Sequence, residues 1–544
     1  MLKTIRITLS LIFFSLITIY FLDFTGNLPH EFHAMEMIQF VPALLAMNWI
    51  ILLVLLVLTA LFGRVYCSSI CPLGIYQDIV SWFRKRLTNK KHRKRYKYLR
   101  AMNILRWSFL GATIIAFLFG FSFLVGLLDP YSAFGRILVH VLKPAYLAGN
   151  NLLASLLIPA GNFTFYKVGV YLLSLSSTVI ALVTLIIISI MAWRNGRIYC
   201  NTVCPVGTLL GFISKHALYQ IRFDSENCTL CGRCARTCKA SCIDFKNMTV
   251  DASRCINCFN CIEECKESGL KFKRKTENGK RKAENNAPSL RGVHKVNDEA
   301  TLLSITQGFS ARRSPLSVFR SPLDSASRRR FLTALSLTAL AAGRVLADKT
   351  LRLGPKKNVA RTQPIMPPGA FSIEKFSRQC TSCHLCVSKC PAQIIKPAFL
   401  EYGIGGVMQP MLDFKHQFCN YDCTICADVC PTGALTHLDQ ETKHHTQIGR
   451  VQLYLENCIV YTDETSCGAC SEHCPTQAVH MVPYKGHLTI PEINPEICVG
   501  CGGCEFICPS QPWKAIFVEG VTLHKTIELK QEEVEQVEVE GFGF

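Results

Sequence analysis

The sequence predicts a multi-domain protein in which a four-helix transmembrane unit precedes small α+β domains. Two observations carry this prediction. Strongly apolar segments are confined to the first two hundred residues of a 544-residue chain. In addition, 24 of the 29 cysteines fall into six regularly spaced quartets in the remainder. A membrane segment joined to soluble domains explains both features.

Four apolar stretches form the expected membrane unit, residues 1–215. Each is close to the ~20 residues that a helix needs to cross the hydrocarbon core; they are residues 7–22, 39–62, 105–127 and 168–193. The loop from Arg84 to Arg106 holds 11 Lys and Arg, whereas the loop at residues 23–38 holds none. The positive-inside rule therefore places both ends of this unit in the cytoplasm.

The membrane unit contains an internal repeat. The segment G-R-V-Y-C-x3-C-P-L-G at residues 63–74 recurs as G-R-I-Y-C-x3-C-P-V-G at residues 196–207. Each copy follows the second span of a pair, which predicts a duplicated two-helix module. Arg and Tyr are also ordinary interfacial anchors, but anchoring does not explain the cysteines. Such thiols can relay electrons or hold a soft metal such as Cu(I), so they are candidate catalytic residues: Cys67, Cys71, Cys200 and Cys204.

The six quartets carry the chemistry of the soluble domains. Most read C-x2-C-x2-C-x3-C, the run by which bacterial ferredoxins hold [4Fe-4S] clusters and share the fourth thiolate with a neighbouring cluster. Disulfides need no such repeated spacing, and zinc sites tolerate looser intervals. We therefore expect α+β ferredoxin-like domains with six [4Fe-4S] clusters. Two quartets lie in residues 216–275: Cys228, Cys231, Cys234, Cys238 and Cys255, Cys258, Cys261, Cys265. Four lie in residues 348–544: Cys380, Cys383, Cys386, Cys390; Cys419, Cys423, Cys426, Cys430; Cys458, Cys467, Cys470, Cys474; and Cys498, Cys501, Cys504, Cys508.

Ligand sharing follows from the ferredoxin rule in the first domain. One cluster is expected to be held by Cys228, Cys231, Cys234 and Cys265, and the other by Cys255, Cys258, Cys261 and Cys238. Cys242 has no partner in the pattern and is expected to be a bystander, with alternative ligation left open. The segment from Cys380 to His384 also matches the C-x-x-C-H haem signal, but the ferredoxin run uses the same thiols, so haem is not expected there.

An internal export signal is expected between the two parts. Residues 276–326 are basic and poor in aromatics, which indicates a disordered linker. The sequence S-R-R-R-F-L at residues 327–332, followed by a mild apolar run, resembles a twin-arginine signal or anchor over residues 327–347. A basic patch before an interfacial helix is the alternative. Export would place the folded four-cluster domain in the periplasm, after its clusters are built in the cytoplasm.

Charge is distributed unevenly along the chain. The net charge is +20, yet residues 348–544 hold 16 Lys and Arg against 22 Asp and Glu. The basic excess therefore lies in the loops beside the spans and in the linker. Anionic lipid and topology explain it better than nucleic acid, which is not an expected partner.

These motifs resemble two known families. Residues 1–275 are similar to NapH, membrane quinol dehydrogenase subunits with four spans, two C-x3-C-P motifs and a two-cluster ferredoxin, and residues 327–544 resemble NapG, exported four-cluster ferredoxins. Lys in place of Pro after Cys238 and Cys265 departs from the pattern. The resemblance implies that outer and inner motifs share ligands in the exported domain: Cys380, Cys383, Cys386 with Cys508; Cys498, Cys501, Cys504 with Cys390; Cys419, Cys423, Cys426 with Cys474; and Cys458, Cys467, Cys470 with Cys430.

The resemblance implies a membrane-bound iron-sulfur protein of the cytoplasmic membrane that moves electrons from quinol to a periplasmic reductase or cytochrome. A maturation or copper-handling factor similar to NosR or CcoG is the alternative. Proton acceptors at the periplasmic edge would be His30, Glu31, His33, Glu36, Asp129 and His140, each expected individually to be a solvated loop residue. About 30 Å of hydrocarbon would separate the clusters on the two sides, and no haem-ligand pair within the spans bridges it.

Overall fold

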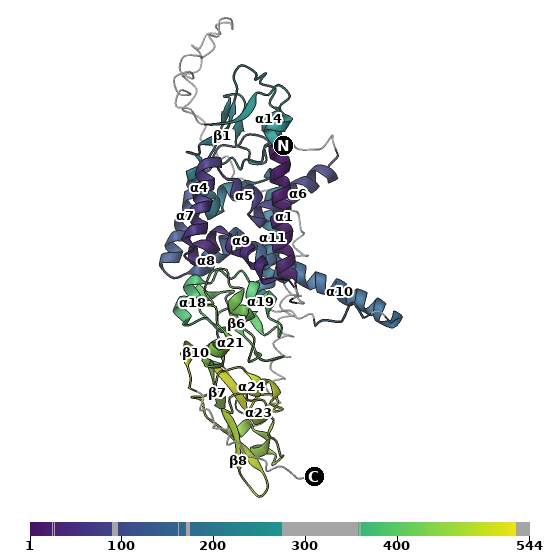
Figure 1. The fold of residues 1–544 in the computed structure, drawn as a ribbon, viewed down its shortest axis with the longest axis vertical. Coiled ribbons are helices and arrows are strands. Elements are labelled where there is room, and N and C mark those ends of the chain that lie inside the picture. The colour runs from purple at the N-terminus through teal and green to yellow at the C-terminus, as the bar shows by residue number, and fades with distance from the viewer. Residues whose placement is uncertain are drawn as a thin grey trace, which may run out of the picture. The chain divides into compact units, whose positions relative to one another are not determined.

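The computed structural model describes residues 1–23, 26, 28–89, 96–161, 163–169, 174–274, 357 and 361–528. The described parts of residues 1–275 and 358–544 belong to one compact unit (Figure 1). The expected linker at residues 276–326 and the twin-arginine-like segment at residues 327–347 lie outside the described residues.

Two helices of the membrane unit are long and apolar enough to cross a bilayer. They are α1 (Leu2–Leu22) and α11 (Leu175–Asn195), which correspond to the first and fourth expected spans. The second expected span is divided into α3 (Phe40–Leu45) and α4 (Trp49–Phe62), and the third into α7 (Asn103–Leu118) and α8 (Ser122–Leu128). Hydropathy alone did not reveal these breaks, because Met47 and Gly120, whose φ angles are positive, lie within apolar sequence.

Shorter helices fill the unit between and after these segments. Each repeat forms the same pair, a one-turn helix with the first cysteine and a longer helix that begins at the proline after the second cysteine. The pairs are α5 (Val65–Ser69) with α6 (Pro72–Leu87), and α12 (Ile198–Thr202) with α13 (Pro205–Ser214). Proline suits the first position of a helix because it needs no hydrogen-bond acceptor there. The other elements are η1 (His30–His33), α2 (Ala34–Met37), α9 (Pro130–Ile137), the π-helical η2 (Leu138–Leu142), α10 (Lys143–Leu157) and η3 (Ile158–Ala160).

The first ferredoxin domain, residues 216–274, is closed by an antiparallel pair. Its strands β1 (Tyr219–Phe223) and β4 (Leu270–Arg274) enclose the hairpin of β2 (Ile243–Asp244) and β3 (Thr249–Val250). Helices α14 (Arg233–Thr237) and α15 (Asn260–Glu264) each carry the third cysteine of a motif. Gly232 and Phe259, which follow the second cysteines, have positive φ and turn the chain into these helices.

The second ferredoxin domain, residues 361–528, repeats this design twice. Three antiparallel pairs support it: β5 (Ile395–Pro397) with β6 (Pro410–Leu412), β7 (Thr446–Leu453) with β10 (Ile516–Thr526), and β8 (Val479–Pro483) with β9 (Thr489–Ile493). The remaining elements are α18 (Ile373–Gln379), α19 (Leu385–Lys389), η5 (Ile404–Gly406), α20 (Ile425–Asp428), α21 (Gln440–His444), η6 (Leu455–Asn457), α22 (Ile459–Thr462), α23 (Ala469–Glu472) and α24 (Gly503–Ile507).

Helix α1 contacts both ferredoxin domains, one at each end (Figure 1). Near the start of α1, Lys3 forms an ion pair with Glu263 of α15. Just past the end of α1, Asp23 forms a 2.7 Å ion pair with Lys389 of α19. A 21-residue helix rises about 1.5 Å per residue, so α1 is about 30 Å long, close to the thickness of the hydrocarbon core. The two ferredoxin domains therefore contact opposite ends of a membrane-length helix.

Candidate functional site

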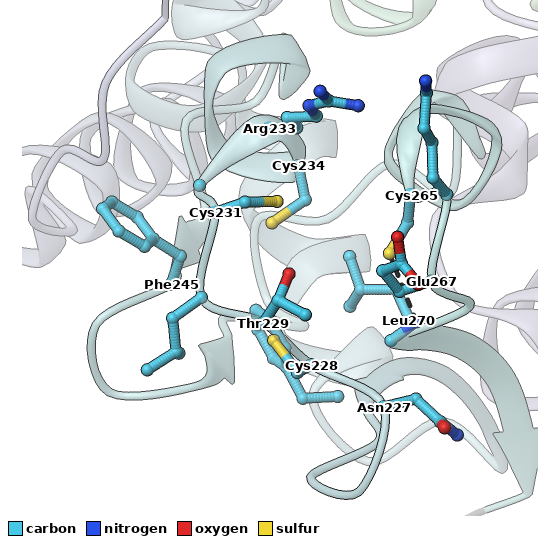
Figure 2. Close-up of a pocket in the computed structure, with 15 residues that line it drawn as sticks. Asn227, Cys228, Thr229, Cys231, Arg233, Cys234, Phe245, Cys265, Glu267 and Leu270 are labelled. Atoms are coloured by element: carbon cyan, nitrogen blue, oxygen red, sulfur yellow. Dashed lines mark hydrogen bonds between the residues drawn. The ribbon is translucent and has the colours of Figure 1, made fainter.

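The first ferredoxin domain brings together the cysteines that its spacing assigned to one site. Cys228, Cys231, Cys234 and Cys265 line a cavity of about 170 Å³. Figure 2 shows these side chains around one space, with Cys265 contributed by a separate loop. The backbone N–H of Gly269 donates a 3.2 Å hydrogen bond to the Cys265 sulfur. Such donors orient and stabilise thiolate ligands.

The second site of this domain contains an additional thiol. Burial raises the pKa of Cys258 to about 11, with the nearby Cys238 thiol adding to the shift, so the fourth cysteine of one motif joins the other motif as expected. Cys242 is 1% exposed, and its sulfur lies 3.6 Å from that of Cys238. It also interacts with Cys255. Cys242 therefore lies directly against this site, which gives a geometric basis to the alternative that it serves as a ligand.

In the second ferredoxin domain the fourth cysteine of each motif lies beside the neighbouring motif. The expected sharing between outer and inner motifs is wrong, because the two halves of the domain fold as successive two-site modules. We name the four sites by their cysteines: site A is Cys380, Cys383, Cys386 and Cys430; site B is Cys419, Cys423, Cys426 and Cys390; site C is Cys458, Cys467, Cys470 and Cys508; and site D is Cys498, Cys501, Cys504 and Cys474. The cysteines of sites B, C and D line cavities, and Cys474 and Cys501 of site D also reach the cavity of site B. The Cys390 thiol acts electrostatically on Cys419 and Cys426, whereas the Cys474 thiol acts on the other three cysteines of site D. In site A the Cys430 thiol acts electrostatically on all three cysteines of the first motif.

The six quartets fit iron-sulfur clusters. Backbone N–H groups of Leu435 and Gly500 each donate a 3.3 Å hydrogen bond to a cysteine sulfur, Cys430 and Cys498. Among the described residues no three metal-ligating side chains close around a single ion. When bound, such clusters supply one-electron carriers whose potentials depend on these hydrogen bonds and on burial.

Site A lies directly against the membrane unit. Three basic side chains, one helical turn apart on α9, η2 and α10, contact the first motif. Arg136 donates a 3.1 Å hydrogen bond to the Ser382 carbonyl, and the rings of His140 and His384 are joined by a 2.8 Å hydrogen bond. Lys143 contacts the hydroxyl of Ser388 at 2.8 Å. The second ring nitrogen of His384 lies 2.8 Å from the Met408 carbonyl, so both nitrogens of the histidine in the C-x-x-C-H segment have partners within the protein.

Two glycines permit this close approach. A Cβ atom on Gly126 would lie 2.3 Å from the Thr381 carbonyl oxygen, and one on Gly135 would lie 2.4 Å from the Cys383 carbonyl oxygen. Both distances are far below van der Waals contact. Any larger residue would separate the site A loop from the membrane helices.

Reciprocal hydrogen bonds join the two repeats. Arg64 donates a 3.0 Å hydrogen bond to the Cys200 carbonyl, and Arg197 donates a 2.6 Å hydrogen bond to the Cys67 carbonyl. Both arginines are fully buried. Because both side chains are buried inside the protein, these arginines are not interfacial anchors. Arg197 also pairs with Asp78 of α6 at 2.9 Å, which joins the second repeat to the first.

Most of the expected proton acceptors are buried rather than solvated. His33, Glu36, Asp129 and His140 are at most 5% exposed, whereas Glu31 is exposed, and the His30 side chain lies outside the described residues. Asp129 caps α9 by accepting hydrogen bonds from the backbone and hydroxyl of Ser132. Its role is therefore structural.

Glu36 is the strongest proton acceptor among them. It is fully buried on α2, and burial raises the pKa of its carboxyl to about 8, although Tyr131 and Lys389 lower it. Its charge also acts on Cys383 of site A. A carboxyl with a pKa near neutral can take up and release protons under physiological conditions. The sequence could not reveal the raised pKa of Glu36, because residues 23–38 have the composition of an ordinary polar loop.

A cavity of about 670 Å³ lies where the membrane unit meets the second ferredoxin domain. Apolar residues of both parts form its walls: Leu28, Val139, Leu147 and Val168 from the membrane unit, and Val387, Ile425 and Val429 from the domain. Tyr20, Lys143 and Lys389 add polar groups, and Cys390 of site B lies in the wall. Its size and mixed lining suit a small apolar ligand with polar ends.

Comparisons with known proteins agree with this arrangement. A family described as "4Fe-4S binding domain" matches residues 44–91 and again residues 177–223, and two families described as "4Fe-4S dicluster domain" match residues 379–435 and 465–511. The "Ferredoxin-type protein NapG" of Escherichia coli (strain K12) is 30% identical over 202 residues, which is 35% of this chain and 84% of NapG. The chain belongs to the NapG family of ferredoxin-type proteins.

Other relatives of this family carry similar names. The "Ferredoxin-type protein NapF" of Escherichia coli (strain K12) is 28% identical over 145 residues, 27% of this chain and 80% of NapF. The "Methylamine utilization ferredoxin-type protein MauM" of Methylorubrum extorquens is 30% identical over 158 residues, 27% of this chain and 70% of MauM. No solved structure matches the chain. The match to residues 379–435 covers the first two motifs, and the match to residues 465–511 covers the last two apart from Cys458, in agreement with the pairing of neighbouring motifs.

Proposed function

We propose that the protein is a quinol dehydrogenase-type electron carrier of the cytoplasmic membrane, which moves electrons from quinol to a periplasmic reductase or cytochrome. Six [4Fe-4S] clusters would be held by the six quartets. The N-terminus and the first ferredoxin domain would lie in the cytoplasm and the second ferredoxin domain in the periplasm. The contacts of both domains with opposite ends of α1 support this topology.

The observation that carries the proposal is the cavity between the membrane unit and the second ferredoxin domain. A quinol head group needs an apolar site that opens near the membrane, a proton acceptor and an electron acceptor close by. The cavity supplies apolar walls and lies against Cys390 of site B. Glu36 lies beside site A and shares Lys389 with the cavity wall. The chain's own residues would therefore bind the quinol, exclude water and accept its protons.

The maturation alternative fits the geometry less well. A factor that delivers Cu(I) to a partner needs thiols that the partner can reach. Cys67, Cys71, Cys200 and Cys204 are each at most 5% exposed. The four quartets of the second ferredoxin domain would also have no task in copper transfer.

A quinol-reduction assay with Glu36→Gln tests the proposal. The anaerobic, oxidised protein in nanodiscs is mixed with a soluble menaquinol analogue, and cluster reduction is followed by absorbance. Because Glu36 accepts a proton only when ionised, the initial rate should rise about tenfold per pH unit below pH 8 and level off above it. Glu36→Gln should remove this rise. Glu31→Gln, an exposed carboxylate on the adjacent η1, is the matched control and should keep it.

Dithionite defines complete reduction in the same samples. A quinol that reduces no clusters in a protein that dithionite reduces fully would refute the proposal. An unchanged pH profile in Glu36→Gln would refute the role of this carboxyl.

A further inference from the structure

The four thiols of the two repeats gather in one buried place. Cys67 and Cys71 come from the first repeat, and Cys200 and Cys204 come from the second. Their exposed fractions range from 3 to 5%. All six pairs among these four thiols interact electrostatically. The repeats therefore contribute two thiols each to a single site.

The surroundings of the thiols suit an anionic group. The Arg64 guanidinium lies 3.8 Å from the Cys67 sulfur, and the Gln77 amide donates a 3.3 Å hydrogen bond to the Cys200 sulfur. Three fully buried polar atoms of this shell have no hydrogen-bond partner among the described residues: Arg64 Nε, Arg197 Nη2 and Gln77 Oε1. Buried donors normally have partners, because an unpaired donor costs about 1–3 kcal/mol. Each guanidinium group makes other hydrogen bonds, and the one nitrogen of each that has no partner leaves a donor for an anionic group at this site.

Both second cysteines lie at the start of a helix. Cys71 caps the 16-residue α6, and Cys204 caps the 10-residue α13. The positive end of a helix dipole stabilises a thiolate. The backbone N–H of Gly207 donates a 3.3 Å hydrogen bond to the Cys204 sulfur, the same contact that Gly500 makes with Cys498 in site D. The second repeat therefore has the same kind of backbone hydrogen bond to a cysteine sulfur as a ferredoxin quartet.

Two observations identify the class of ligand. The buried guanidinium groups of Arg64 and Arg197 lie beside Cys67, so the site suits a ligand that is held by ionised thiolates. Each repeat matches a "4Fe-4S binding domain", yet each holds only two cysteines, whereas such clusters are held by four. We propose that Cys67, Cys71, Cys200 and Cys204 jointly hold one iron-sulfur cluster between the repeats.

The position of this site connects the two ferredoxin domains. On one side Asn201 donates to the Ala240 carbonyl at 3.2 Å, two residues after Cys238 of the first domain. On the other side Tyr199 donates to the Leu128 carbonyl at 3.0 Å. The neighbouring Gly126 carbonyl accepts from Arg136, which also binds Ser382 beside site A. A seventh cluster at this site would thus lie between the two clusters of the first ferredoxin domain and the four clusters of the second. This position is the same for either direction of electron flow.

Iron analysis of the full-length, anaerobically purified protein tests the proposal. Six cubanes account for about 24 iron per chain, so the unmutated protein should hold about 26 if the joint cluster is [2Fe-2S] and about 28 if it is [4Fe-4S]. The double variant Cys67→Ser/Cys200→Ser should fall to about 24 and lose one signal from the EPR spectrum of the reduced protein. The matched control Ser69→Ala/Thr202→Ala changes buried residues of the same short helices and should keep both.

The outcomes are decisive in either direction. Equal iron in the unmutated protein and the double variant, at about 24, would overturn the proposal, as would stoichiometric copper or zinc that the double variant loses. If the double variant misfolds, it loses iron from the ferredoxin quartets as well, and the count in the unmutated protein then decides. Because iron content and EPR signals do not depend on quinol, this result is independent of the proposed function.

Discussion

Removal of the Asp78 charge tests the structural core that joins the two repeats to the first ferredoxin domain. Asp78 is buried on α6 and pairs with three cations from three different parts of the chain. Its carboxylate lies 2.9 Å from Arg6 of α1, 2.9 Å from Arg197 of the second repeat and 3.3 Å from Lys239 beside Cys238. Asp78→Asn keeps the shape but leaves these cations without a counter-charge.

The expected cost is large because the network is buried. Two charge-assisted hydrogen bonds are lost, from Arg6 and Arg197, at about 1.5–3 kcal/mol each. Measured costs of breaking buried ion pairs, about 3–5 kcal/mol, agree with this sum. At roughly 2–4 °C per kcal/mol for a unit of about 250 residues, the midpoint of the first thermal transition should fall by about 6–20 °C.

Thermal unfolding in detergent measures this shift, with iron-sulfur absorbance as the signal. Asp224→Asn is the matched control in the same ferredoxin domain. Asp224 pairs with Lys271 and Lys273, whose side chains are 41% and 52% exposed, so its transition should stay within error of the unmutated protein. A shift below about 3 °C in Asp78→Asn would refute the energetic role assigned to this network.

The effect should not depend on pH near neutrality. Burial opposes ionisation of Asp78, but Arg197, Lys239 and Arg6 outweigh it and hold the pKa of this carboxyl below its ordinary value. The stabilisation is therefore present above the ordinary Asp pKa and is lost only as the pH falls through the lowered value. The difference between Asp78→Asn and the unmutated protein should accordingly be equal at pH 6 and pH 8.

Two further predictions concern the second ferredoxin domain. Gly135→Val would place a side chain against the Cys383 carbonyl and Phe21, so hydrogen exchange at residues 380–390 should rise at least tenfold, whereas Gly149→Val, at an open position of α10, should leave it unchanged; equal exchange in both variants would contradict the docking of site A. A phosphatase fused after Phe544 should be active in the periplasm, and Arg328→Lys with Arg329→Lys should abolish that activity; activity confined to the cytoplasm in the unmutated chain would reverse the proposed topology.

The cysteine pattern predicted the local chemistry but not the long-range pairing. Spacing alone grouped the first three cysteines of every motif, because one-turn helices such as α19 and α24 are built from neighbouring residues. The fourth ligand in the second ferredoxin domain depends on which motifs become neighbours in space. Contacts of α19 with α20 and of α23 with α24 bring neighbouring motifs together, and local spacing does not encode these contacts.

The structure of the membrane unit differed more from the sequence-based expectation, because its contacts also join residues that are far apart in the sequence. Hydropathy located all four apolar stretches but not the breaks near Met47 and Gly120. The repeat predicted equivalent positions for its two thiol pairs, and in both copies the second cysteine precedes a helix that begins at a proline. It did not reveal that Arg64 and Arg197 reach across to the other copy, because such contacts arise only when the repeats pack together. The raised pKa of Glu36 was not predicted, because it depends on burial of the side chain, which the sequence of residues 23–38 does not show.

Electron delivery to the periplasmic side tests the central claim most directly. Right-side-out membrane vesicles from cells that produce the chain are supplied with menaquinol, and reduction of external ferricyanide, which does not cross the membrane, is measured. The account predicts faster reduction than in vesicles with Arg328→Lys/Arg329→Lys, and no such difference in inverted vesicles. Equal rates in the unmutated and variant right-side-out vesicles, with the chain present and its clusters intact, would contradict it.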